Sequence, residues 1–521
     1  MEERYITAID MGTSKLALTV ARIDGENVQI VFYKTTSSDG IRNSSIFNPA
    51  KVAARLKDLV KEAEDELKIK ITNAVVGLPR YCVRQETGTA TINRTDGNSI
   101  ITREEIDSMK DLALESYPLD DSKKEIIYGA AAQSFSTEDY FQQIESDIIG
   151  MPSDTLSGNF KIFVGAKRPV SNIDSVFNSI NLAISKKYFI PEIIAKGCLS
   201  PEEIENGAAL IDFGAGVTSV TVYQGNILRH YGAIPFGGQV ITNDIKTECS
   251  ISADLAENIK QAYGACMPNK LQTLSEKIIQ IEKDDISVQV PVKYLSEIIT
   301  SRVKEIIEAI LYEIQESGFA DNLRNGVVLT GGGANLTNCA NYIKELSGYN
   351  VRVGFPKRNL FTSSCNGIFE TETTSSLGMI LAAKGNRHIN CVSASETYQT
   401  SRIQATGQTH IPTDIPDIKT PHVQPSRHQV PSSTDPTFPE AYAPADRTHV
   451  APIPAKSQEP SHLEAKKPES KEPDLINPEE FGPKQEKPKK PQREHAFWKK
   501  FTKSLNEGVG TLYDKTNNDS I

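Results

Sequence analysis

Two stretches of the chain, roughly two hundred residues apart, share one pattern: an apolar strand ending on Asp, a turn of small residues, and a second strand. The first copy is residues 8–15, with Asp10 at the end of its strand, and the second is residues 210–218, with Asp212. The first copy continues as a predicted hairpin over 16–33, because Asp-Gly between two apolar strands favours a tight turn. Such a repeat predicts two related lobes that face one ligand.

Both turns have the residue types that bind phosphate. Small residues let backbone N–H groups approach a phosphate closely, while hydroxyls and an ammonium group add donors and positive charge. The candidates are Gly12, Thr13, Ser14 and Lys15 in the first turn and Gly214, Ala215, Gly216 and Val217 in the second. Because Mg²⁺ prefers carboxylates, often through its waters, Asp10 and Asp212 are expected to position a magnesium ion. A tight turn without a ligand is the alternative for either copy alone, and the matched flanks of the two copies argue against it.

A third loop follows an apolar strand at 327–330 and consists of small residues. Its candidate ligand-binding residues are Gly331, Gly332, Gly333 and Ala334. Consecutive glycines let the backbone pass flat against a ligand, and a helix expected over 337–346 would offer free N–H groups. The loop matches neither the P-loop pattern nor the dinucleotide fingerprint.

Together these three loops resemble those of the actin/Hsp70/hexokinase ATPase superfamily, and most closely those of the FtsA family of actin-like bacterial division proteins. The resemblance covers about the first 385 residues and includes the segments 149–151, 234–238, 298–307 and 374–378. It implies an α/β, actin-like two-lobed ATPase fold with inserted subdomains. It also implies that the loops bind ATP with Mg²⁺.

The resemblance implies a division into subdomains. Subdomain 1A comprises 1–82, 166–205 and 353–386, the inserted subdomain 1C comprises 83–165, subdomain 2A comprises 206–245 and 318–352, and subdomain 2B comprises 246–317. A disordered Pro-rich linker is expected over 387–494 and an amphipathic membrane-targeting helix over 495–516. In the FtsA family, subdomain 1C serves self-association and contacts with other division proteins.

Two further site residues come from the second lobe. Ser252 is a plausible N-cap for a helix that carries Glu257 and Lys260 on one face. In the superfamily a Glu-x-x-Lys pair contacts the ribose and adenine, so the resemblance gives that role to Glu257 and Lys260; an exposed intrahelical ion pair is the alternative. Arg302 lies in a predicted helix at a position that resembles one the family uses to bind FtsZ, with a solvated arginine as the alternative.

Composition separates a folded part from a long polar segment. Residues 387–494 are rich in Pro, Ser, Thr, Lys and Glu and contain most of the 28 prolines. Without apolar periodicity this segment is expected to be disordered, with a reach of roughly 50–60 Å.

The net charge of −10 gives no general basic face, which argues against a nucleic-acid partner. Seven scattered cysteines, with no signal peptide expected, indicate reduced cytosolic thiols.

Apolar residues return near the end of the chain at helical spacing. The expected membrane-binding residues are Phe497, Trp498, Lys499, Lys500, Phe501, Lys503 and Leu505. An aromatic apolar face beside lysines suits the headgroup boundary of an anionic leaflet. No stretch approaches 18 apolar residues, so no bilayer-crossing segment is expected. A helix that docks onto the folded part or onto a partner is the alternative.

The resemblance implies an adaptor of the division machinery. ATP would close the two lobes, and closed subunits would stack into filaments. One lobe would hold the FtsZ C-terminal peptide, and the last helix would bind anionic lipids. The expected location is the cytoplasmic face of the inner membrane at the septum, with later division proteins as further partners. Two other classes stay open: a membrane-linked scaffold of the PilM type, and a small-molecule kinase of the hexokinase superfamily, which would need a catalytic Asp in a substrate cleft.

Fast hydrolysis of ATP is not expected. Hydrolysis needs a group that orients water in line with the γ-phosphate, and no acid or Gln can be assigned to that role. Val217 stands where many relatives have a hydroxyl, and Ser219 where an acid often stands. The sequence therefore predicts weak or no ATPase activity.

Overall fold

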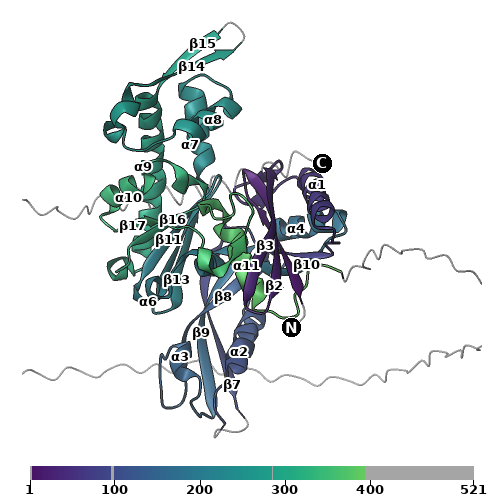
Figure 1. The fold of residues 1–521 in the computed structure, drawn as a ribbon. Helices are drawn as coiled ribbons and strands as arrows, with labels where there is room; N and C mark the ends of the chain where they lie inside the picture. The colour runs from purple at the N-terminus through teal and green to yellow at the C-terminus, as the bar shows by residue number, and fades with distance from the viewer. Residues whose placement is uncertain (1–2, 95–98, 284–285, 394–521) are drawn as a thin grey trace, which may run out of the picture. The chain divides into compact units, whose positions relative to one another are not determined.

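The computed structural model describes residues 3–94, 99–283 and 286–393 (Figure 1). The terminal helix expected over 495–516 and nearly all of the expected linker lie outside these residues and stay predictions. Among the described helices, none combines the length and apolar character needed to span a bilayer. The fold of the described part is α/β and consists of two large sheets, one smaller sheet and their covering helices.

The first large sheet has six strands in the order β10-β6-β1-β2-β3-β18. Its strands are β1 (Arg4–Met11), β2 (Lys15–Asp24), β3 (Asn27–Ser37), β6 (Asn73–Gly77), β10 (Ala183–Tyr188) and β18 (Thr362–Ser363). Its helices are α1 (Pro49–Leu67), α4 (Lys167–Ser179), α5 (Ile190–Cys198) and α11 (Thr374–Lys384). Successive residues of β1 face opposite sides: Ile9 packs with α1 and α4, whereas Ala8 packs with α5 and α11. The β2–β3 pairing confirms the hairpin predicted over 16–33.

The second large sheet has five strands in the order β13-β12-β11-β16-β17. Its strands are β11 (Ala208–Phe213), β12 (Thr218–Gln224), β13 (Ile227–Ile234), β16 (Val327–Thr330) and β17 (Val351–Val353). Its helices are α6 (Pro201–Asn206), α7 (Gly238–Glu248), α8 (Ala253–Tyr263), α9 (Val292–Glu316) and α10 (Cys339–Ser347). On one face Ile211 packs with α7, α8, α9 and α10, whereas Leu210 faces the apolar cluster of α5 and α11. The cluster of α5 and α11 therefore joins the two large sheets.

The smaller sheet has the order β7-β9-β8 and an apolar core of its own. Its elements are β7 (Arg84–Asn93), β8 (Glu125–Ser136), β9 (Thr155–Ala166), α2 (Arg103–Ser116) and α3 (Glu145–Ile148). Figure 1 shows this group below the two large sheets, with the hairpin β14 (Ile278–Lys283) and β15 (Ile286–Pro291) at the opposite end. It occupies the part of the chain where the insertion over 83–165 is expected.

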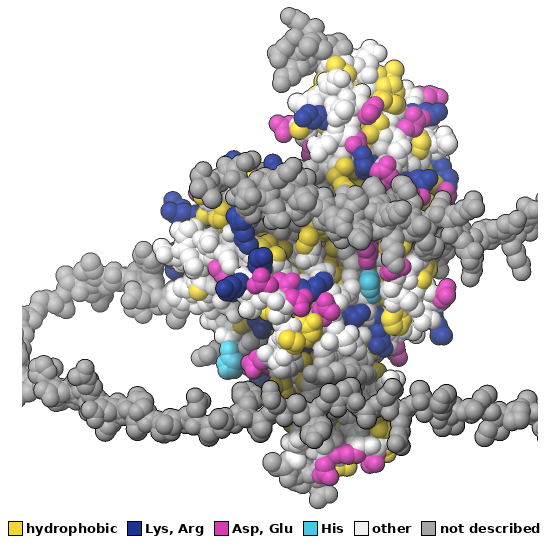
Figure 2. Space-filling view, turned by 180° about the vertical axis from the view of Figure 1, so that it is seen from behind, with side chains coloured by type: hydrophobic (Ala, Val, Ile, Leu, Met, Phe, Trp, Pro, Cys, Tyr) yellow, Lys and Arg dark blue, Asp and Glu magenta, His cyan; other side chains and the backbone are white. Residues whose placement is uncertain are grey.

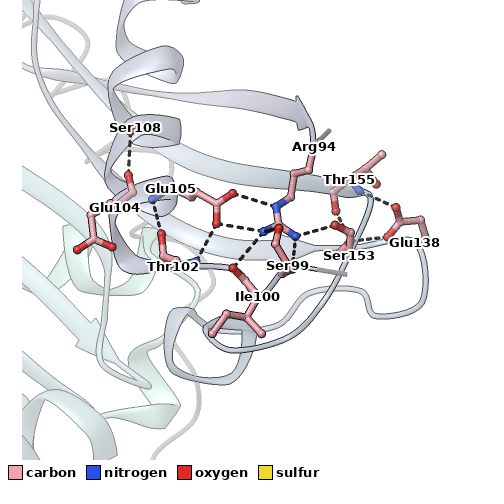
Figure 3. Close-up of polar contacts among 10 residues, drawn as sticks. All are labelled: Arg94, Ser99, Ile100, Thr102, Glu104, Glu105, Ser108, Glu138, Ser153 and Thr155. Carbon is pink, nitrogen blue, oxygen red and sulfur yellow. Dashed lines mark hydrogen bonds and ion pairs between the residues drawn. The ribbon is translucent and has the colours of Figure 1, made fainter. Parts of the chain in front are cut away.

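Arg94 organises the end of the smaller sheet (Figure 3). Its Nη1 donates to the carbonyl oxygens of Ser99 and Ser153, both at 2.7 Å, and its Nε donates to Glu105 Oε1 at 2.9 Å. Glu105 also forms the capping box of α2 with Thr102. One buried guanidinium thereby ties the start of α2 to the loop that precedes β9.

Short elements complete the described chain. They are β4 (Ile41–Arg42), β5 (Ser45–Ile46) and the 3₁₀ turns Pro268–Lys270, Gln272–Glu276, Ala320–Asn322, Gly332–Asn335, Arg358–Leu360 and Thr371–Thr373. On the side of the molecule that Figure 2 draws, acidic and basic side chains are interspersed over the described part. All seven cysteines are free thiols in the structure.

The expected start of the linker at residue 387 is wrong. Cys391 is fully buried, and its N–H donates to the Tyr5 carbonyl at 2.7 Å. Val392 forms a β-bridge with Ile71, just before β6 of the first sheet. The packed chain therefore continues to at least Val392, since a short apolar segment inside a polar stretch is enough to dock there.

Candidate functional site

The two Asp-containing turns have the same backbone geometry. In the first turn the Gly12 N–H donates to the Lys15 carbonyl at 3.0 Å, and in the second the Gly214 N–H donates to the Val217 carbonyl at 3.0 Å. Asp10 pairs with residue 17 across β1–β2 and Asp212 with residue 219 across β11–β12, seven positions later in each hairpin. The sequence repeat is therefore a repeat of structure, as predicted.

The two turns face each other directly. A Cβ added at Gly216 of the second turn would lie 2.6 Å from Thr13 Oγ1 of the first, so a larger residue would push the turns apart. The second turn is also held from behind, because a Cβ at Gly237 would lie 2.3 Å from the Gly214 carbonyl oxygen. The glycine at position 216 therefore sets how closely the two halves approach, and the glycine at 237 sets the packing within the second half.

The glycine loop lies beside the second turn. Gly331 has φ = 84°, a left-handed conformation that favours glycine, and a Cβ there would lie 2.6 Å from Asp212 Oδ1. A Cβ at Gly333 would lie 2.3 Å from the Phe213 ring, whereas one at Gly332 would meet nothing closer than 3.8 Å. Of the three glycines, Gly332 alone therefore leaves room for a side chain.

Two expectations about this loop are corrected. The helix expected over 337–346 begins only at Cys339, because its N-cap Asn338 has φ = 61°, and a 3₁₀ turn intervenes. The helix N-terminus thus does not follow the glycines directly. Ala334 is buried in the apolar core of the second sheet and does not line the cleft.

The three loops converge on one cleft of about 860 Å³. It is lined by every candidate ligand-binding residue except Ala334, namely Asp10, Gly12, Thr13, Ser14, Lys15, Asp212, Gly214, Ala215, Gly216, Val217, Glu257, Lys260, Gly331, Gly332 and Gly333. These residues come from both large sheets and from α8. A cleft of this size, surrounded by glycine turns and charged side chains, is suited to a ligand of nucleotide dimensions.

Glu257 and Lys260 form one corner of the cleft. Helix α8 begins after Ser252, whose side chain caps it as predicted. Lys260 Nζ donates to Glu257 Oε2 at 2.7 Å, to Thr242 Oγ1 at 2.8 Å and to the Gly238 carbonyl at 2.9 Å. Burial by itself raises the pKa of Glu257, but the hydrogen bonds from Lys260 and Thr242 outweigh it and lower the pKa below its ordinary value. Because the Lys260 side chain is only 11% exposed, the alternative of an exposed ion pair does not describe it.

Arg80, which the sequence patterns did not single out, lies between the two aspartates. Its Nη1 is 2.5 Å from Asp212 Oδ2, its Nη2 is 3.4 Å from Asp10 Oδ1, and Nη2 also donates to Ser375 Oγ at 2.8 Å. Burial would lower the pKa of Arg80, but the Asp212 and Asp10 carboxylates outweigh it and raise that pKa. The sequence position of Arg80 could have indicated its place in the site. It follows β6, which is a parallel neighbour of β1, and parallel strands end at the same edge of a sheet.

A magnesium ion does not fit between Asp10 and Asp212 with Arg80 in this position. Mg²⁺ takes oxygen ligands at about 2.0–2.1 Å in an octahedron, and the guanidinium already pairs with Asp10 Oδ1 and Asp212 Oδ2. Within the described ranges, no three His, Cys, Asp or Glu side chains are grouped so that they could hold a metal ion. Arg80 therefore opposes direct coordination of Mg²⁺ by the two aspartates, and the expected role of these aspartates toward a magnesium ion through its waters stays a prediction.

Lys15 has a partner that the sequence did not predict. Its Nζ lies 2.5 Å from Glu372 Oε1, on the segment that precedes α11. Glu372 and Ser375 both line the cleft, although neither is among the site residues predicted from the sequence. Glu372, which lies near the C-terminal end of the described chain, thus holds the lysine of the first phosphate-type turn.

Arg302 lies away from the cleft. It projects from α9, which confirms the predicted helix, and does not line the cleft. Its Nε donates to Asp244 Oδ2 at 2.5 Å and its Nη1 to Glu305 Oε2 at 2.6 Å, with 29% of the side chain exposed. Arg302 is therefore a half-buried cation that links α9 to α7 rather than a freely solvated one.

The sequence is similar to that of cell division proteins named FtsA. The family model "Cell division protein FtsA" matches residues 209–378. The cell division protein FtsA of Neisseria meningitidis serogroup B is 29% identical over 360 residues, which are 68% of this chain and 85% of the relative. That of Borreliella burgdorferi is 28% identical over 391 residues, or 73% of this chain and 91% of the relative.

A solved structure supports the fold. The PilM–PilN type IV pilus biogenesis complex contains a chain that aligns with a TM-score of 0.51 at 14% identity, covering 72% of this chain and 98% of that one. At this identity the likeness concerns the fold alone. It agrees with the actin-like arrangement of two large sheets around a cleft, which was predicted from the sequence.

Proposed function

We infer that the chain belongs to the FtsA family of cell division proteins, to which it is similar over most of its described length. We propose that it binds ATP, polymerises, and tethers FtsZ filaments to the cytoplasmic face of the inner membrane at the septum. The observation that carries this proposal is the convergence of two matched Asp-Gly turns and a glycine loop on one cleft. That arrangement supplies backbone N–H groups and the Lys15 ammonium to a polyphosphate. Later division proteins are its further proposed partners, through the group of β7, β8 and β9.

ATP acts in this proposal as a ligand that sets the closure of the two halves. The cleft residues come from both large sheets, so a nucleotide that contacts both favours the closed arrangement. Val217 and Ser219 offer no acid to orient water, and both are buried. Hydrolysis is therefore weak or absent, and the bound nucleotide stabilises the form that stacks into filaments.

FtsZ is proposed to bind near Arg302, through its C-terminal peptide. Arg302 is partly exposed and positively charged, so it can attract an acidic peptide. Asp244 and Glu305 already neutralise much of this charge, so a peptide carboxylate would have to compete with them. This competition makes the role of Arg302 testable.

Arg302→Ala is expected to weaken binding of the FtsZ C-terminal peptide by about tenfold to a hundredfold, because a charge-assisted hydrogen bond contributes about 1.5–3 kcal/mol. Asp244→Asn is the matched control, since it loses the same internal ion pair but keeps the guanidinium. Peptide titration monitored by fluorescence anisotropy measures both variants. Equal weakening by the two variants would mean that Arg302 only positions α9.

Membrane attachment is proposed to reside in residues 497–505, which lie outside the described residues. Trp498→Glu is expected to release the protein from anionic vesicles, because it places a charge on the apolar face that enters the headgroup boundary. Trp498→Phe is the control, since it keeps an aromatic side chain. Sedimentation with vesicles of phosphatidylglycerol and phosphatidylethanolamine measures the bound fraction, and equal sedimentation of parent and Trp498→Glu would remove the anchor hypothesis.

The whole proposal is tested by sedimenting FtsZ with these vesicles in the presence of the full chain. We expect FtsZ to sediment with the parent protein and ATP, and to stay in solution when Trp498→Glu replaces the parent. FtsZ that sediments equally with Trp498→Glu would contradict tethering through the terminal helix. FtsZ that stays in solution although the parent protein sediments would contradict the adaptor function.

A further inference from the structure

Arg80 connects the two halves of the cleft through an ion pair with Asp212. It belongs to the first sheet, where it follows β6, and its guanidinium reaches Asp212 at the end of β11 in the second sheet. The other carboxylate, Asp10, ends β1 next to β6. The three side chains form an acid–base–acid row across the two phosphate-type turns.

Several contacts fix this arginine in place. Besides its ion pairs, Nη2 donates to Ser375 Oγ at 2.8 Å. The Arg80 backbone N–H donates to Ser44 Oγ at 3.2 Å, and its carbonyl oxygen accepts a hydrogen bond from the Tyr231 hydroxyl. The side chain is 16% exposed. Moving the guanidinium away would break these contacts and leave Asp212, which is almost fully buried, without its cation.

A guanidinium and a divalent cation compete for this position. Both are attracted by the carboxylates of Asp10 and Asp212, and two positive groups placed between the same carboxylates would repel each other. Arginine remains charged throughout the physiological pH range, so the competitor is always present. The planar guanidinium also presents several N–H donors that match the geometry of phosphate oxygens. It can therefore both carry the positive charge and bind the phosphates directly, as the cation of a nucleotide site must.

We propose that the Arg80 guanidinium takes the place of the divalent cation between the two turns, so that this chain binds a nucleoside triphosphate with little or no dependence on magnesium. The inference rests on the proposed nucleotide site and names the group that supplies its central positive charge. Lys15, on the first turn, lines the same cleft and would supply a second cation to a triphosphate. Arg80 thereby couples nucleotide binding to the contact between the two halves.

The test is equilibrium binding of a fluorescent ATP analogue to the full chain, once with excess Mg²⁺ and once with excess EDTA. For the parent protein the dissociation constants in the two buffers are expected to agree within about threefold. Arg80→Ala is expected to lose about tenfold or more in affinity when EDTA replaces Mg²⁺, because removal of the guanidinium frees the two carboxylates for a metal ion. Arg80→Lys keeps a charge at this position and is expected to lie between the two.

Electron paramagnetic resonance with Mn²⁺ gives a second readout. Nucleotide-bound Arg80→Ala is expected to hold a Mn²⁺ ion that Asp10→Asn in the same background releases, while the parent protein holds none at the aspartates. If Arg80→Ala does not fold, the comparison of the parent protein in Mg²⁺ and EDTA still decides the question. Binding by the parent protein in Mg²⁺ but not in EDTA overturns the role of Arg80 and leaves the nucleotide site standing. Binding in neither buffer overturns the proposed function itself, and the inference with it.

Discussion

Gly332→Asp is expected to abolish the rise in melting temperature that ATP gives to the parent protein. Gly332 lines the cleft, and a Cβ there has no neighbour closer than Glu372 Oε2 at 3.8 Å, so the aspartate fits without disturbing the fold. Its carboxylate would enter a cleft that already holds Asp212 and Glu372. Added negative charge and bulk there oppose a polyphosphate ligand.

The expected loss is large. A ligand present at about a hundred times its dissociation constant stabilises the folded state by about 2.7 kcal/mol, and nearly all of this should disappear. Differential scanning fluorimetry with and without ATP measures it, and the melting temperature without ATP should stay near that of the parent. Gly332→Ala, which adds only a methyl group, is the matched control and should keep most of the response. A full ATP response of Gly332→Asp would show that the glycine loop does not hold the nucleotide.

The neighbouring glycines cannot replace Gly332 in this experiment. At Gly333 a methyl group would collide with the Phe213 ring, and at Gly331 the left-handed backbone and the nearby Asp212 exclude any side chain. Substitutions there would damage the fold first, so a lost ATP response would have two explanations. The sequence Gly-Gly-Gly alone does not distinguish these three positions.

The parts of the site that local sequence predicted are those that one short segment defines. The turns around Asp10 and Asp212 were predicted because their residue order sets their backbone geometry, and the structure gives both the same hydrogen bond. The N-cap Ser252 and the helices that carry Lys260 and Arg302 follow from spacing in the same way.

The parts that sequence missed depend on contacts between distant segments. Arg80 meets Asp212 across 132 residues, and Lys15 meets Glu372 from the opposite end of the folded chain. The hydrophobic periodicity of a helix or strand carries no information about such pairs, because their members lie on different elements. Ala334 shows the reverse error: it continues a ligand-type loop in sequence, but the 3₁₀ turn directs it into the apolar core. Composition likewise missed the docked segment at Cys391, because its few apolar residues are diluted by polar neighbours.

Lys260→Met is expected to weaken ATP binding by about tenfold to a hundredfold, the effect of losing one charge-assisted hydrogen bond. The resemblance to the superfamily gives Lys260 a role at the nucleoside end of the ligand, away from the two phosphate-type turns. Methionine keeps the length of the side chain and removes its charge. Because Lys260 also donates to the Gly238 carbonyl and Thr242 between α7 and α8, the melting temperature without ligand should fall as well.

The two roles of Lys260 are separated by a comparison of ligands. If Lys260 contacts the nucleoside, the variant loses affinity for ATP but keeps that of the parent for inorganic tripolyphosphate, which has no nucleoside; isothermal titration calorimetry measures both. Glu257→Gln is the companion variant, since it breaks the ion pair, leaves the Lys260 bonds to α7 in place, and tests the nucleoside role that the resemblance gives to Glu257. A purely structural ion pair would lower the melting temperature of both variants and change neither affinity. That result would leave ATP held by its phosphates alone, and Glu257 and Lys260 would serve only to join α8 to α7.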